Sequence, residues 1–101
     1  MVTIKKIDDE IYEAEIQNSA LIIDKHTGYH LKKEIGKILA NKRKITVNMM
    51  QVDAMDKNGF QMLEQLVDLA NKKNCSLSFI NYGNPIASKF NLLYKSKEKA
   101  L

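Results

Sequence analysis

The chain opens with two short segments in which apolar and polar residues alternate. Residues 2–7 place Val2 and Ile4 at a period of two, and residues 11–16 alternate in the same way. This period is typical of strands that turn one face to a core and the other to water. Asp8-Asp9-Glu10 separates the two segments with turn residues. The pattern therefore predicts an antiparallel hairpin at the start of the fold.

The period then changes to that of a helix. After the apolar residues 21–23, Asp24 or Thr27 is suited to cap a first helix, which is expected to begin at about Thr27. Gly36 inside this helix costs about 1 kcal/mol relative to alanine, which suggests a role in close packing. The stripe that faces the core is predicted from residues at helical spacing: Leu31, Ile35, Ile38 and Leu39.

The second half of the chain alternates strand and helix patterns again. Residues 45–49 form a strand pattern, and the apolar neighbours Met50 and Val52 favour a central, well-covered position. Residues 75–80 form the next strand pattern, and the Asn84-Pro85 turn precedes a short last helix. The apolar stripe of the helix between these strands is Phe60, Leu63, Leu66, Val67 and Ala70, and that of the last helix is Ile86, Phe90 and Leu93.

The predicted order is β-β-α-β-α-β-α. Strands that alternate with helices favour a mostly parallel four-stranded sheet with helices packed on it, to which the hairpin adds an antiparallel strand. The chain has 101 residues, which is enough for one core. We expect one domain over residues 1–94 and a basic tail over residues 95–101.

Composition narrows the function classes only modestly. The net charge of +4 is weak evidence for nucleic acid, and no aromatic residues are interleaved with the basic clusters. No apolar run approaches the roughly 20 residues of a membrane span, and the N-terminus lacks the apolar stretch of a signal peptide. The single cysteine, Cys75, is expected to be buried, and a cytoplasmic location fits a chain without a disulfide.

Three segments carry a resemblance to a known family. A strand leads into Asp56-Lys57-Asn58-Gly59, where a helix begins, and Leu21-Ile22-Ile23-Asp24 precedes the first helix. Residues 85–90 follow the last strand with a small-residue turn and a helix. In this order the segments resemble the STAS domain of the anti-sigma factor antagonist family, which is bacterial and regulatory.

The resemblance implies a site at the start of the second helix. Asp56 and Gly59 match the family's Asp and Gly, and Asn58 stands where phospho-regulated members carry a phosphoserine. Asn58 has no hydroxyl, so this surface is not phospho-switched there. An exposed Met55 would suit an adaptable partner surface. The predicted partner-binding residues are Asp24, Met55, Asp56, Lys57, Asn58, Gly59 and Met62.

The residues alone explain part of this motif. Asp56 or Asn58 can cap the unpaired N–H groups of a helix start, and Gly59 lets another backbone approach closely. Asp-Lys-Asn-Gly is also a competent turn and cap in a protein of any function. The local motif is therefore read as a partner surface only together with the whole-chain resemblance.

The expected function is that of a non-enzymatic interaction domain. The resemblance implies an ATP-binding anti-sigma kinase, a stressosome-like protein or an ABC-transporter ATPase as partner. The alternative is a ligand-sensing or transporter-associated subunit that binds a nucleotide or lipid, since a helix N-terminus suits an anion. The sequence leaves open whether a dimer covers an edge strand.

Other groups of residues give weaker evidence for a metal, a cofactor or a catalytic site. His26 and His30 share a helix spacing, but the metalloprotease pattern fails and no third ligand is evident, so we expect two surface histidines and no metal. Asp53 and Asp56 do not fit the register of a calcium loop. No catalytic set or cofactor motif is found.

Overall fold

The computed structural model describes residues 2–16, 22–83 and 86–88. Residues 86–88 are helical. The other elements follow in the order β1 (Val2–Asp8), β2 (Ile11–Ile16), β3 (Ile22–Ile23), α1 (Lys25–Gly36), β4 (Lys44–Asn48), β5 (Ala54–Met55), α2 (Lys57–Lys72) and β6 (Ser76–Ile80).

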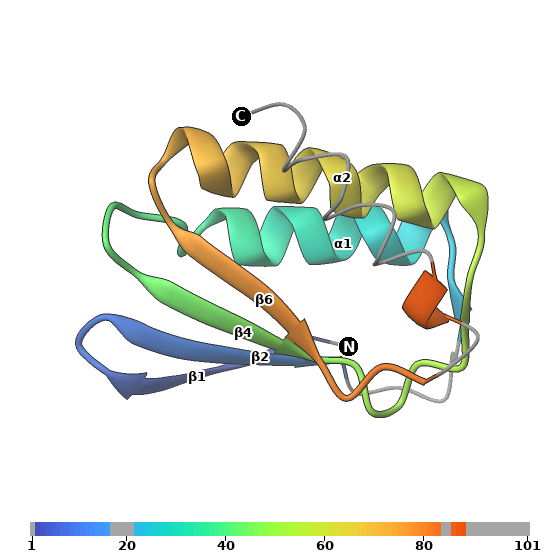
Figure 1. Cartoon of the computed structure of the whole chain (residues 1–101), viewed down its shortest axis with the longest axis horizontal. Coiled ribbons are helices and arrows are strands. Elements are labelled where there is room, and N and C mark those ends of the chain that lie inside the picture. Colours follow the sequence, from blue (N-terminus) through green and yellow to red (C-terminus); the bar gives the residue numbers. More distant parts are fainter. Residues whose placement is uncertain (1, 17–21, 84–85, 89–101) are drawn as a thin grey trace.

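The main sheet has four strands in the order β1-β2-β4-β6. β1 and β2 form the antiparallel hairpin, while β2, β4 and β6 run parallel. Helices α1 and α2 lie side by side over one face of this sheet (Figure 1). The predicted α/β architecture, the opening hairpin and the central place of β4 are therefore confirmed. A second sheet, formed by β3 and β5, was not predicted.

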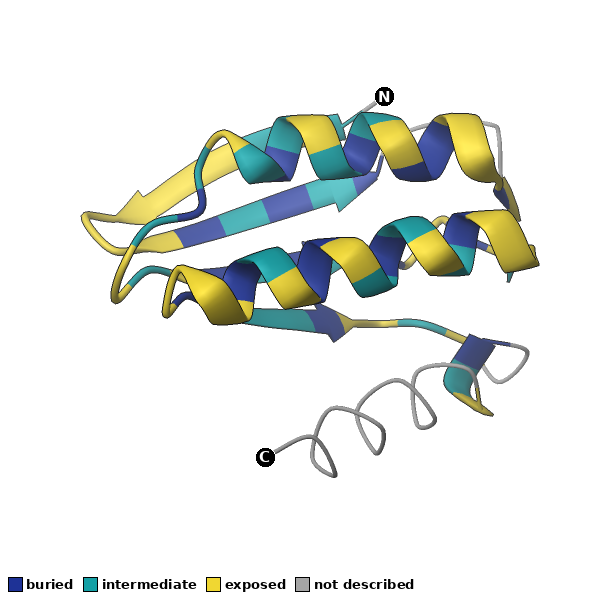
Figure 2. Ribbon diagram, turned by 90° about the horizontal axis from the view of Figure 1, so that it is seen from above, coloured by how far each residue is buried: buried dark blue, intermediate teal, exposed yellow. Residues whose placement is uncertain are grey.

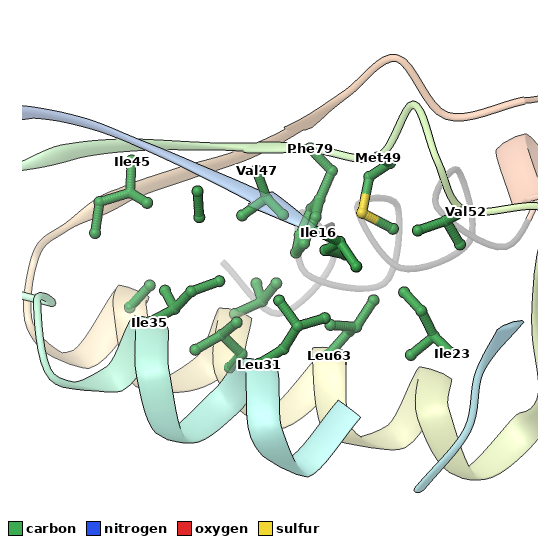
Figure 3. Packing of buried hydrophobic residues seen from close by; sticks show 14 of the residues in the cluster. Ile16, Ile23, Leu31, Ile35, Ile45, Val47, Met49, Val52, Leu63 and Phe79 are labelled. Carbon is green, nitrogen blue, oxygen red and sulfur yellow. The ribbon is translucent and has the colours of Figure 1, made fainter. Parts of the chain in front are cut away.

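The core fills the space between the sheet and the two helices. Alternate residues of the strands point toward the helices, and the inner stripe of each helix is buried (Figure 2). Fully burying one such side chain stabilises the fold by about 1.5–3 kcal/mol. Figure 3 shows how these side chains meet across the layers: Ile16, Ile45, Val47, Met49 and Phe79 from the sheet side, and Leu31, Ile35 and Leu63 from the helices.

One packing prediction is wrong. Gly36 is not a close contact, since a β-carbon there would lie 4.0 Å from Leu69 Cδ2. The close approach is at Gly28, where a β-carbon would lie 2.7 Å from Met62 Cβ. Gly28 therefore allows α1 and α2 to pack closely. Met50, which favoured a central position for its strand, is itself 68% exposed, because β4 ends at Asn48 and the chain turns outward there.

Several smaller predictions have clear outcomes. α1 begins at Lys25, two residues before the expected start, because Asp24 rather than Thr27 caps it. Cys75 is buried, as expected. The predictions for Pro85, for Phe90 and Leu93, and for the tail at 95–101 lie outside the described residues.

Candidate functional site

The small sheet places the starts of the two helices next to each other. β3 and β5 are parallel, with Ile22 paired with Ala54 and Ile23 with Met55. The Asp56 backbone N–H donates a hydrogen bond of 3.0 Å to the Ile23 carbonyl. Because α1 follows β3 and α2 follows β5 directly, both helices run from the same end of the molecule (Figure 1). These two pairs of residues between β3 and β5 thus fix how the starts of α1 and α2 lie relative to each other.

An aspartate caps each helix start. Asp24 Oδ1 accepts a hydrogen bond of 2.9 Å from the Thr27 backbone N–H. Asp56 Oδ1 accepts one of 2.7 Å from the Gly59 backbone N–H. The prediction that Asp56 or Asn58 caps α2 is resolved in favour of Asp56. Asn58 is exposed and keeps its side chain outside the cap.

Gly59 is the tightest backbone contact of the site. A β-carbon at this position would overlap the carbonyl oxygen of Ile23 and lie 2.7 Å from its carbonyl carbon. This confirms that Gly59 permits close backbone approach. The approaching backbone is β3 of the same chain, which holds the start of α2 against the start of α1.

An open groove of about 520 Å³ lies between the two helix starts. From the predicted set it brings together Asp24, Asp56, Asn58 and Met62. From α1 it adds residues that the sequence analysis did not place in the partner-binding set: Lys25, His26 and Tyr29. The sequence held a signal for Tyr29, since this aromatic residue lies off the predicted apolar stripe of its helix. In the structure it is 59% exposed.

Three predicted residues do not line the groove. Met55 is only 3% exposed and belongs to the core, so the expectation of an exposed Met55 is wrong. It is buried because β5 pairs with β3 and turns this side chain inward. Gly59 is buried beneath the helix start, whereas Lys57 is exposed beside the groove. The accessible surface is therefore smaller on β5 and larger on α1 than predicted.

The two histidines lie differently. His26 is exposed in the groove, while His30 is half-buried one turn further along α1. Among the described residues, no three His, Cys, Asp or Glu side chains are grouped to hold a metal ion. In the same part of the chain, no helix combines the length and the apolar character needed to cross a membrane.

Low pH is expected to reduce the stabilisation of the start of α1 by its capping residue Asp24. The hydrogen bond from the Thr27 backbone N–H stabilises the charged carboxylate and lowers the pKa of Asp24 below its ordinary value. Because this pKa is lower in the folded chain than in the unfolded chain, the stabilisation is complete above the unfolded pKa of about 3.9. It is lost as the pH falls through the folded pKa.

Urea unfolding of wild type and Asp24→Asn at about pH 5 and about pH 2 measures this effect. Asparagine also caps helices but has no titrating carboxyl. The variant should therefore lose less stability on acidification than wild type. An equal loss in both chains would show that Asp24 does not contribute.

The fold and the groove define a single α/β domain with an open groove between two capped helix starts. A comparison with family models matches the STAS domain over residues 3–98. The chain therefore belongs to the STAS domain family, and the resemblance of the three sequence segments is confirmed.

Solved structures share this fold at low sequence identity. A chain of "Crystal Structure Analysis of Mglu" has a TM-score of 0.69 and 11% identity, over 81% of this chain and 20% of that chain. A chain of "The overall structure of SLC26A9" has a TM-score of 0.58 and 12% identity, over 87% of this chain and 17% of that chain. This chain thus spans a fifth or less of each. A comparison with curated proteins finds no match.

Proposed function

We propose that this STAS domain is a non-enzymatic regulatory domain that docks a protein partner at the groove between α1 and α2. The observation that carries the proposal is the groove itself, which gathers four of the seven predicted partner residues between the starts of α1 and α2. Exposed side chains from both helices, Tyr29 and Asn58, border it.

Asn58 sets the electrostatic state of this surface. In phospho-regulated members of the family this position is a serine, and phosphorylation would add about −1.5 to −2 charges. Asparagine keeps the position neutral, so the domain is proposed to remain competent for docking without dephosphorylation. The proposed partners are an ATP-binding anti-sigma kinase, a stressosome-like protein or an ABC-transporter ATPase in a bacterial cytoplasm.

Replacing Asn58 by glutamate is expected to reduce partner binding by about tenfold, because it places a fixed negative charge at the centre of the groove. The change should leave the fold intact, since a carboxylate is favourable in the first turn of a helix. Affinity capture from lysate of the source cell, followed by titration with the purified partner, measures the loss.

Asn71→Glu is the matched control. Asn71 is an exposed asparagine on the same helix, near the end that lies away from the groove. This variant should retain wild-type affinity. If folded Asn58→Glu binds the purified partner as tightly as wild type, the docking surface is elsewhere.

The groove also supports a second function, in which the domain senses a nucleotide or lipid or serves a transporter. Its volume of about 520 Å³ is within the range of small-molecule sites. Isothermal titration of the domain with nucleotides and with phospholipid vesicles distinguishes the two functions. Saturable binding that Tyr29→Ala abolishes would favour ligand sensing, and its absence would favour protein docking.

A further inference from the structure

Asn58 is the only asparagine in the sequence that is followed by glycine. Asparagine is chemically labile, because the backbone nitrogen of the next residue can attack its Cγ atom. Glycine favours this attack, since it has no side chain to shield its nitrogen and its backbone is the most permissive. Asn58 is exposed, and its side-chain amide forms no hydrogen bond with another described residue. By its local sequence, Asn58 is therefore the most reactive asparagine of the chain.

The packing of the site keeps this reactive pair of residues in place. A β-carbon at Gly59 would overlap the carbonyl oxygen of Ile23 and lie 2.7 Å from its carbonyl carbon. The fold thus requires glycine at this position, and no larger neighbour can shield Asn58. The lability of Asn58 is a consequence of the close approach between β3 and the start of α2.

The capping hydrogen bond of α2 opposes the attack. The Gly59 N–H is one of the first four N–H groups of the helix, which have no partner within it. It donates a hydrogen bond of 2.7 Å to Asp56 Oδ1 instead. Gly59 is also buried, and side chains in a helix are tilted toward its N-terminus, so the Asn58 amide is turned away from the Gly59 nitrogen. The attack therefore requires that the first turn of α2 open.

We propose that Asn58 is a site of spontaneous deamidation and that the Asp56 cap controls its rate. When the cap opens, the Gly59 nitrogen loses its proton to water and forms a bond with Asn58 Cγ. The bond between Cγ and Nδ2 breaks, ammonia leaves, and the new ring is an imide. Water then opens the ring to aspartate or isoaspartate, so the reaction consumes water and needs neither an enzyme nor an oxidant.

Deamidation changes the charge of the groove. It replaces a neutral amide by a carboxylate at the position where phospho-regulated members of the family carry a phosphoserine. This consequence rests on the proposed docking function: the deamidated chain should bind the partner about tenfold more weakly, as expected for Asn58→Glu. The change is irreversible and needs no kinase.

The test is incubation of the whole chain at mildly alkaline pH, followed by trypsin digestion and mass spectrometry against an unincubated sample. Residues 58–72 form one tryptic peptide, so its fragments compare Asn58 directly with Asn71, an exposed asparagine that precedes lysine. In the folded chain, Asn58 should deamidate faster than Asn71. In urea the rate at Asn58 should rise by at least about tenfold, because the first turn of α2 no longer has to open.

Three variants test control by the cap. Asp56→Ala should raise the rate at Asn58 in the folded chain about fivefold, which corresponds to the loss of a helix cap. Asp56→Asn keeps a capping oxygen and should react at the wild-type rate. Asp24→Ala is the matched control, because it removes the equivalent hydrogen bond of 2.9 Å from α1. It should leave the rate at Asn58 unchanged.

The outcomes separate this inference from the docking function. The inference is overturned if Asn58 in the folded chain reacts no faster than Asn71, or as fast as it does in urea. Equal acceleration by Asp24→Ala and Asp56→Ala would show that the whole chain has to unfold, which overturns control by the cap. If the purified deamidated chain binds the partner like wild type, the docking surface is wrong and the modification site stands.

Discussion

Replacing Gly59 by alanine is expected to lower the free energy of unfolding by about 3 kcal/mol. The added methyl group would overlap the Ile23 carbonyl oxygen, which is backbone and cannot rotate away. Relief requires β3 and the start of α2 to separate, which would break the hydrogen bond from Asp56 N–H to Ile23. Urea unfolding followed by circular dichroism measures the loss.

Gly36→Ala is the control for this prediction. A β-carbon at Gly36 would lie 4.0 Å from Leu69 Cδ2, which is ordinary contact, and no glycine among the described residues has a positive φ. Alanine there should raise stability by about 0.5 kcal/mol through its higher helix propensity. If both variants change stability alike, the close approach at Gly59 does not constrain the fold.

The second large effect is expected at Met49. This side chain is fully buried between the sheet and the helices (Figure 3), and truncation to alanine leaves a cavity there. Buried Met→Ala substitutions cost about 2–5 kcal/mol. We expect a loss of about 3 kcal/mol, measured as a shift of the urea midpoint at constant slope.

The adjacent residue provides the control. Met50 has the same side chain but is 68% exposed, so Met50→Ala should change the free energy of unfolding by less than about 0.5 kcal/mol. The pair compares burial at constant residue type. A loss at Met50 comparable to that at Met49 would contradict the assignment of Met50 to the surface.

These two methionines show where periodicity is informative. The alternation of Ile45, Val47 and Met49 predicts that Met49 is buried, and the structure confirms its burial although β4 ends one residue earlier, at Asn48. The same alternation places Met50 on the opposite face, where it is 68% exposed, so the apolar character of this residue alone was not an indication of burial. Regular elements of five or more residues were predictable because the buried positions on one face recur at a fixed spacing.

The small sheet shows the opposite case. β3 and β5 have two residues each, which is too short for any period to be visible. Their pairing joins segments about thirty residues apart and depends on Gly59, which lets the backbones meet. Met55 was predicted to be exposed because the residues next to it in the sequence give no indication of the pairing between β3 and β5 that buries it.

The candidate site was likewise predictable only in part from the sequence. The local motif was enough to identify Asp56 or Asn58 as the cap, Gly59 as a point of close approach and Asn58 as a position that cannot be phosphorylated. The structure selects Asp56 as the cap. It did not identify Tyr29 or Lys25, because these residues reach the groove from the other helix. Only the parallel packing of α1 and α2 brings the two sets of side chains together.

The sequence by itself determined the order of the long elements, the buried faces of the strands and helices, two candidate caps for each of the two long helices, and the STAS family. These properties depend on residues close together in the chain, whose spacing and hydrogen-bonding capacity are local. The tertiary structure decided the pairing of β3 with β5, the burial of Met55, the exposure of Met50 and the composition of the groove. These properties depend on contacts between segments that are distant in the chain. Such contacts form only in the folded structure as a whole, so no local pattern of residues indicates them.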